Sequence, residues 1–174
     1  MAITLVATPK SATANTYALL ATAETYHESH VDASGTWADA TDPDKNIALA
    51  MATRLLDAKY AWEGYATDAD QILQWPRNGL WDYIELNLVD ADTYPLQLKN
   101  ATAEQARLLL GGDTTADLAQ SVQGLTGLKV GSIDLKFKES IASSKPVPDS
   151  VATLIPAWWG RLLGGGAIRP IVRA

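Results

Sequence analysis

The sequence predicts a mainly α protein, a small helical bundle of about four helices with one β-hairpin and an extended C-terminal tail. Two patterns carry this prediction. Apolar residues recur at helical spacing in several segments bounded by Pro or Gly, and one segment near 125–138 alternates apolar and polar side chains as a hairpin does. The 174 residues, 47% hydrophobic and 20% charged, suit one soluble domain over 1–163 and a flexible tail over 164–174.

The N-terminal part is expected to hold one extended segment and two helices. Residues 2–7 are apolar and partly β-branched, as in a strand or an extended arm. A first helix is expected over 19–29. A second helix begins near Thr41 or Asp42, either of which can cap it, and Pro43 suits its first turn. Its apolar face has the required spacing and consists of Ile47, Met51, Leu55 and Ala58.

Residues 60–94 form a long connection that is rich in Trp and Tyr. Each aromatic ring offers a large apolar area that needs covering. We therefore expect the connection to pack onto the helices or onto a neighbouring subunit. Within it, the step into Pro76 disfavours a helix at Trp75, while Asn78 and Gly79 favour a turn.

Three more elements are expected after this connection. A third helix spans 95–110 and ends at Gly111 and Gly112, as a glycine C-cap would end it. A hairpin follows over 125–138. The last helix is expected over 150–163, with a kink at Pro156, which lacks the N–H of a helical hydrogen bond. Its apolar stripe consists of Val151, Leu154, Ile155, Trp158 and Leu162.

The chain ends in a segment whose composition favours docking onto another protein. Its hinge is expected to be glycine-rich and consists of Gly164, Gly165 and Gly166. The residues that follow combine apolar and basic side chains with nothing of their own to bury, which suits a groove in a larger assembly. These docking residues are Ile168, Arg169, Pro170, Ile171, Val172 and Arg173.

Charge is unevenly distributed along the chain, whose formal net charge is −6. Residues 1–98 hold 5 Lys and Arg against 14 Asp and Glu. Residues 99–149 are balanced, and residues 150–174 carry three arginines and no acid. Because nucleic-acid binders neutralise phosphates with clustered Lys and Arg, this distribution argues against free DNA as the ligand.

The sequence offers little that could form a catalytic or metal site. It contains no cysteine, which excludes disulfides and thiolate metal sites. Glu24, His27 and His30 lack both the second Glu-x-x-His of di-iron bundles and the His-Glu-x-x-His of zinc proteases. Neither glycine cluster is followed by the Lys-Ser/Thr of a phosphate loop. We therefore expect no enzyme, no metal and no cofactor.

The tryptophans allow two interpretations. They could stack on the bases of single-stranded nucleic acid, but this mode requires neighbouring cations, and the charges between Trp62 and Trp81 sum to −2. Core or interface packing is therefore favoured. The residues concerned are Trp62, Trp75, Trp81, Trp158 and Trp159.

Several segments resemble a phage protein family. The most specific part is Leu73-x-Trp75-Pro76-Arg77. Weaker matches are Trp37, the segment 45–57, Trp62-x-Gly64 and Pro95-x-x-Leu98-x-x-Ala101. These patterns are similar to the head–tail connector proteins of tailed bacteriophages, also called adaptor or head-completion proteins. Some members carry the label DnaT-like single-stranded DNA-binding protein.

The resemblance implies a structural virion protein without catalysis. Such adaptors form a homo-oligomeric ring, often a dodecamer, at the neck between head and tail. They contact the portal protein through the C-terminal segment and a stopper or tail-completion protein on the other side, and genomic DNA passes as cargo. The resemblance also implies assembly in the host cytoplasm with no membrane. The alternative, which the DnaT-like label implies, is a single-stranded DNA-binding module of replication.

Overall fold

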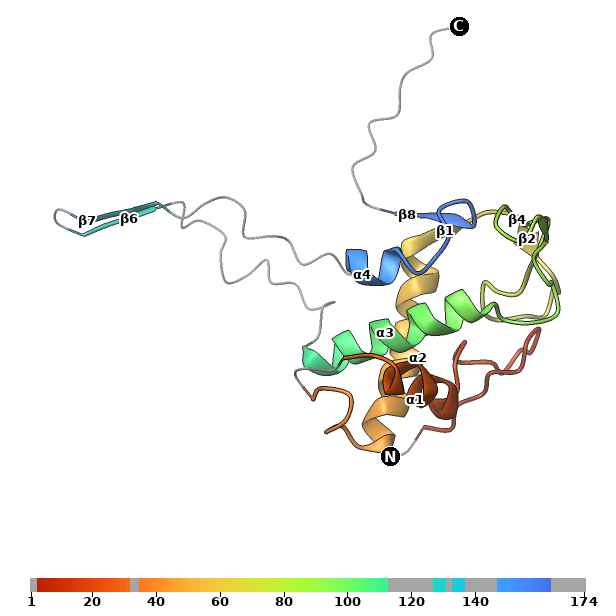
Figure 1. The fold of residues 1–174 in the computed structure, drawn as a ribbon, viewed down its shortest axis with the longest axis horizontal. Helices are drawn as coiled ribbons and strands as arrows, with labels where there is room; N and C mark the ends of the chain where they lie inside the picture. Colours follow the sequence, from red (N-terminus) through yellow and green to blue (C-terminus); the bar gives the residue numbers. More distant parts are fainter. Residues whose placement is uncertain (1–2, 32–34, 113–126, 131–132, 137–146, 164–174) are drawn as a thin grey trace, which may run out of the picture.

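A computed structural model describes residues 3–31, 35–112, 127–130, 133–136 and 147–163 (Figure 1). The described part contains four helices and eight short strands. The helices are α1 (Leu20–Glu28), α2 (Asp42–Lys59), α3 (Leu96–Gly111) and α4 (Asp149–Ala152). The strands are β1 (Tyr60–Trp62), β2 (Tyr65–Ala66), β3 (Arg77–Asn78), β4 (Trp81–Asp82), β5 (Asn87–Leu88), β6 (Gly127–Val130), β7 (Ile133–Lys136) and β8 (Gly160–Leu162).

The predicted mainly α bundle is wrong, because the fold is mixed α/β. The strands pair into antiparallel two-stranded sheets, namely β1 with β8, β2 with β3, β4 with β5 and β6 with β7. The connection over 60–94 supplies β1 to β5, so it folds into small sheets where only a packed connection was expected.

The long last helix predicted over 150–163 is also wrong. The helix α4 makes a single turn and ends at Ala152. Pro156 lies a short way beyond this turn and lacks the N–H that would continue a helix. Residues 160–162 instead form β8, which pairs with β1 at the C-terminal end of α2.

The three earlier helices and the hairpin are confirmed. The side chain of Thr41 accepts a hydrogen bond from the Asp44 N–H at 3.4 Å and so caps α2. The helix α3 follows Pro95 and ends at Gly111. The expected hairpin is β6 with β7, which pair from Gly127↔Lys136 to Val130↔Ile133. The N-terminal residues 3–8 belong to no helix or strand.

Helices α1, α2 and α3 pack through small side chains. Ala48 and Ala52 of α2 lie in one buried cluster with Ala103 and Ala106 of α3, and Ala23 of α1 joins them. Small side chains allow the helix backbones to approach closely at native packing density. Figure 1 shows α3 crossing α2, with α1 beside them.

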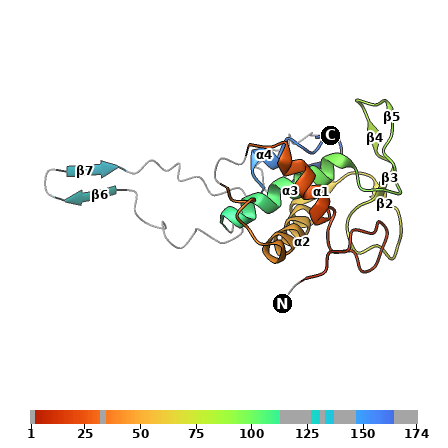
Figure 2. The same ribbon diagram turned by 60° about the horizontal axis from the view of Figure 1, so that its bottom comes forward.

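A second, aromatic cluster holds the connection against the rest of the protein. It consists of Ala14, Tyr17, Leu73, Trp75, Leu80, Tyr94, Leu98 and Trp159. The ring of the fully buried Trp75 lies 5.3 Å from the ring of Trp159 and 5.5 Å from that of Trp62. The connection therefore packs onto the helices, and Figure 2 shows β2 to β5 gathered at one end of the molecule.

Candidate functional site

The Leu73–Arg77 motif closes around a buried guanidinium group. Arg77 Nε donates to the Glu63 carbonyl at 2.6 Å, and its two terminal nitrogens donate to the carbonyls of Gly64 at 2.9 Å and Gln74 at 3.0 Å. The side chain is buried. Arg77 therefore holds the loops together, and its donors are not available to a phosphate group.

Asp57 lies beside this motif at the end of α2. Its carboxylate accepts hydrogen bonds from the Tyr17 hydroxyl and from the Gln74 N–H, the latter at 3.2 Å. Burial raises the pKa of Asp57 to about 6, because it removes the water that would stabilise the charge. Both carboxylate oxygens accept hydrogen bonds from the protein, so Asp57 connects the N-terminal arm and the loop at Gln74 to α2.

Glu24, His27 and His30 do not converge on a metal site. The Glu24 carboxylate accepts a hydrogen bond from Lys45 Nζ at 2.8 Å, and His27 Nε2 donates to the Ala103 carbonyl at 3.1 Å. Burial lowers the pKa of His27. Within the described residues, no three side chains of metal-binding type lie close enough together to hold an ion.

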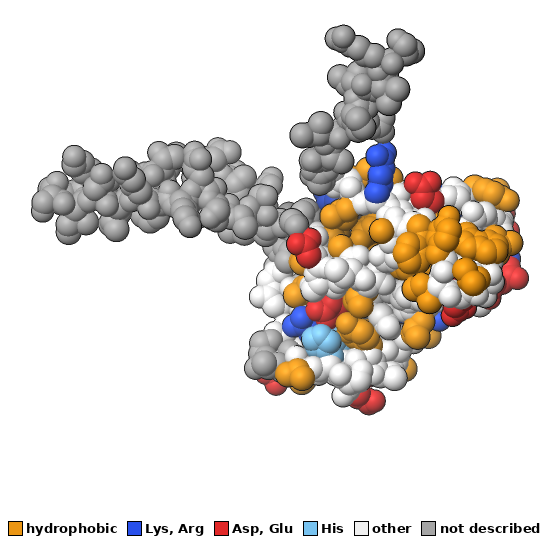
Figure 3. Space-filling model, turned by 45° about the horizontal axis from the view of Figure 1, so that its top comes forward, with side chains coloured by type: hydrophobic (Ala, Val, Ile, Leu, Met, Phe, Trp, Pro, Cys, Tyr) orange, Lys and Arg blue, Asp and Glu red, His pale blue; other side chains and the backbone are white. Residues whose placement is uncertain are grey.

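The five tryptophans divide between the core and an exposed surface. Trp75 and Trp159 are buried, Trp62 is half-buried against the core, and Trp81 and Trp158 are exposed by 43% and 37%. The last two belong to what we call the apolar patch, which consists of Tyr65, Trp81, Tyr83, Ile84, Leu86, Leu88 and Trp158. Figure 3 shows hydrophobic side chains gathered over the end of the molecule that carries β2 to β5. Contiguous exposed apolar surface of this kind marks an interaction site.

The β4–β5 hairpin presents the centre of the apolar patch on a fixed loop. The buried carboxylate of Asp82 accepts hydrogen bonds from the N–H groups of Ile84 at 2.8 Å and Glu85 at 3.2 Å. The loop is thereby held in one conformation. It points the side chains of Ile84 and Leu86 into solvent, where they are 74% and 71% exposed.

The charge along the segment that supplies most of the apolar patch does not suit nucleic acid. No Lys or Arg occurs between Arg77 and Lys99, whereas four acids do. Phosphate binding needs cations next to the stacking rings. In the described ranges, three of the other cations are already paired with acids, namely Lys10 with Asp92, Lys45 with Glu24 and Arg107 with Glu104.

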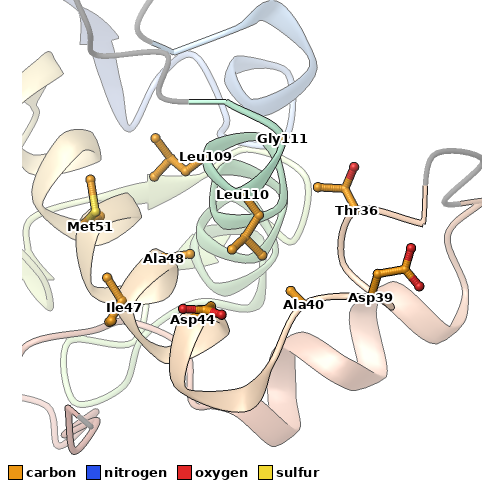
Figure 4. Close-up of a pocket in the computed structure, with 10 residues that line it drawn as sticks. All are labelled: Thr36, Asp39, Ala40, Asp44, Ile47, Ala48, Met51, Leu109, Leu110 and Gly111. Carbon is orange, nitrogen blue, oxygen red and sulfur yellow. The ribbon is translucent and has the colours of Figure 1, made fainter. Parts of the chain in front are cut away.

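A groove of about 650 Å³ lies between the N-terminal half of α2 and the end of α3 (Figure 4). Its apolar lining includes Ile47, Met51 and Leu110, and two carboxylates, those of Asp39 and Asp44, lie along it. Carboxylates repel phosphate. The groove therefore suits an apolar segment that carries cations.

The predicted hinge and docking residues, 164–173, lie outside the described residues. Sequence reasoning missed Ile84, Leu86 and Leu88 as surface residues. The composition of the segment 79–98 could have indicated these three residues, because the segment is rich in apolar residues and has no Lys or Arg.

An exposed apolar patch and an acidic apolar groove are features of a protein that binds other macromolecules. A family model described as "Putative DnaT-like ssDNA binding protein" matches residues 1–174. The chain belongs to this DnaT-like family. Comparison with curated proteins and with solved structures gave no match. None of the helices in the described ranges has the length and hydropathy needed to cross a bilayer.

Proposed function

We propose that the protein is a structural assembly subunit, and specifically a ring-forming head–tail adaptor of a tailed bacteriophage. The observation that carries the proposal is the apolar patch. Its large side chains face water in the single chain, and covering apolar surface contributes about 25 cal/mol per Å². A rigid hairpin that exposes Ile84 and Leu86 suits docking onto a protein surface.

In this role the protein joins the portal protein to a stopper or tail-completion protein at the neck of the virion. The resemblance carried by Leu73-x-Trp75-Pro76-Arg77 supports this assignment, and the acidic balance of the chain is consistent with it. Like charges along a channel prevent the phosphate contacts that hold non-specific DNA complexes, so genomic DNA passes without being retained.

Deleting residues 167–174 is expected to abolish association with the portal protein and to leave the fold intact. The deletion removes no described contact, because the last one along the chain is the hydrogen bond that the Leu163 N–H donates to the Lys59 carbonyl next to the β1–β8 sheet. Co-sedimentation of the full and the shortened chain with the portal measures association, and circular dichroism checks the fold. Undiminished portal binding by the shortened chain would show that residues 167–174 do not bind the portal protein.

A single-stranded DNA-binding module is the second candidate. The family description favours it, as do the four aromatic side chains of the apolar patch, on which bases could stack. The lack of Lys and Arg between residues 77 and 99 weighs against it. The two candidates differ in whether the exposed rings contact protein or bases.

A further inference from the structure

A second apolar hollow, of about 570 Å³, lies apart from the groove of Figure 4. The N-terminal arm, α2 and the loop at 72–74 enclose it, and its apolar lining includes Ile3, Ala50, Ile72 and Leu73. Ile72 is 63% exposed. An apolar hollow with an apolar residue exposed at its edge is suited to receive aliphatic side chains.

Two charged side chains line this hollow, and the exposed one is that of Arg54. The side chain of Arg54 is exposed and lines the hollow, and it makes no ion pair among the residues that the structure describes. Asp57 also lines the hollow, but Tyr17 and Gln74 already occupy its two oxygens. A ligand that combines aliphatic groups with one carboxylate would match both the lining and the guanidinium.

The tip of the β4–β5 hairpin has this combination. Ile84 and Leu86 flank Glu85, and the Asp82 carboxylate fixes the loop that carries all three. Leu86 adopts a φ of +54°, a left-handed conformation that disfavours a bulky side chain and that glycine adopts at lower cost.

We propose that the hairpin tip of one subunit inserts into this hollow on a second copy of the chain, where Ile84 and Leu86 are buried and Glu85 pairs with Arg54. The fixed tip cannot reach its own hollow, since in Figure 2 the hairpin points away from the N-terminal arm. The groove of Figure 4 is a poorer receptor, because its carboxylates, those of Asp39 and Asp44, would face Glu85.

The contact joins two different surfaces, so it is heterologous and repeats from copy to copy. Such contacts generate a closed ring when the rotation closes. The inference therefore rests on the proposed assembly function and names the surfaces that join neighbouring subunits.

Disulfide trapping tests the contact directly, because the chain contains no cysteine of its own. Full-length chains carrying only Leu86→Cys are mixed with chains carrying only Ile72→Cys and oxidised. A disulfide forms only where the two Cα atoms lie within about 7 Å. The matched control replaces Ile72→Cys with Ile47→Cys, which lies in the groove of Figure 4.

We expect the Leu86→Cys and Ile72→Cys pair to cross-link about tenfold faster than the control pair, because docking raises the effective concentration. Equal rates in the two pairs, or faster linkage to Ile47→Cys, would overturn the contact. A chain carrying both Leu86→Cys and Ile72→Cys that links within itself as a monomer would also overturn it.

Charge reversal provides a second measurement. Glu85→Arg and Arg54→Glu, each tested alone, are expected to weaken self-association roughly two- to fivefold, and the double reversal to restore it. Sedimentation measures association, and circular dichroism checks that each variant folds. Wild-type association that no reversal changes would overturn the Glu85–Arg54 pairing but leave the assembly function standing. A wild-type chain that stays monomeric at every concentration would contradict both.

Discussion

Replacing Trp75 with alanine is expected to lower the free energy of unfolding by about 3–5 kcal/mol, as truncation of a buried Trp does in other cores. The side chain is fully buried, and its ring contacts those of Trp62 and Trp159. The substitution leaves a cavity where the loop at Trp75, β1 and the segment before β8 meet. Urea unfolding of the two chains, followed by circular dichroism, measures the difference.

Trp81→Ala is the matched control, because it removes the same side chain from the apolar patch. Trp81 is 43% exposed, so its removal forfeits less buried area and leaves no closed cavity. We expect Trp81→Ala to lower the free energy of unfolding by less than half as much as Trp75→Ala does. Equal losses for the two variants would contradict the division of the tryptophans between core and surface.

The stability of the protein is expected to depend on pH through Asp57. Burial raises the pKa of Asp57 to about 6 in the folded chain, whereas an unfolded chain has a value of about 3.9. The folded state therefore holds a proton that the unfolded state releases between these two pH values. The bound proton of Asp57 therefore stabilises the folded chain. This contribution to the free energy of unfolding is fully present below about pH 4 and is lost as the pH rises through about 6, and its full size is about 3 kcal/mol.

Asp57→Asn removes this dependence, because an amide does not titrate in this range. The free energy of unfolding of Asp57→Asn relative to the wild type is expected to rise by about 2 kcal/mol between pH 4 and pH 7, because at pH 4 the unfolded Asp57 is already about half ionised. Urea unfolding of both chains at the two pH values measures this shift, and the other titrating groups are common to both chains. A difference that stays constant with pH would place the Asp57 carboxylate in water.

The helices α2 and α3 could be predicted because local signals mark where they begin and end. Thr41 and Pro43 mark the beginning of α2, and Pro95 and Gly111 bound α3. These residues act through their own backbone and capping chemistry, which does not depend on the rest of the fold. Local chemistry therefore placed these elements correctly.

The sheets could not be predicted in the same way. The strands β2 to β5 have two residues each, too few for an alternation of apolar and polar side chains to show. The apolar stripe that includes Val151 and Ile155 has helical spacing, but Ile155 reaches the core from a turn. Pairing of β8 with β1, about a hundred residues away, overrides the local pattern at 160–162.

The candidate site was only partly predictable. The acidic balance and the packing of the aromatic connection follow from composition. The exposure of each aromatic side chain does not follow from composition, because Trp75 and Trp81 are the same residue type and differ only in what the folded chain places over them. Asp82, which fixes the hairpin tip, gives no sign in the sequence that its carboxylate binds the backbone two and three residues ahead.

Titration of a labelled single-stranded oligonucleotide, followed by fluorescence anisotropy at low and at physiological salt, tests most directly whether the exposed rings serve protein contacts. Because the segment 78–98, which supplies most of the apolar patch, holds four acids and no Lys or Arg, we expect no saturable binding at physiological salt with micromolar protein. Tight binding with a steep salt dependence, lost in Trp81→Ala or Tyr83→Ala, would contradict the assembly role and establish the apolar patch as a platform for bases.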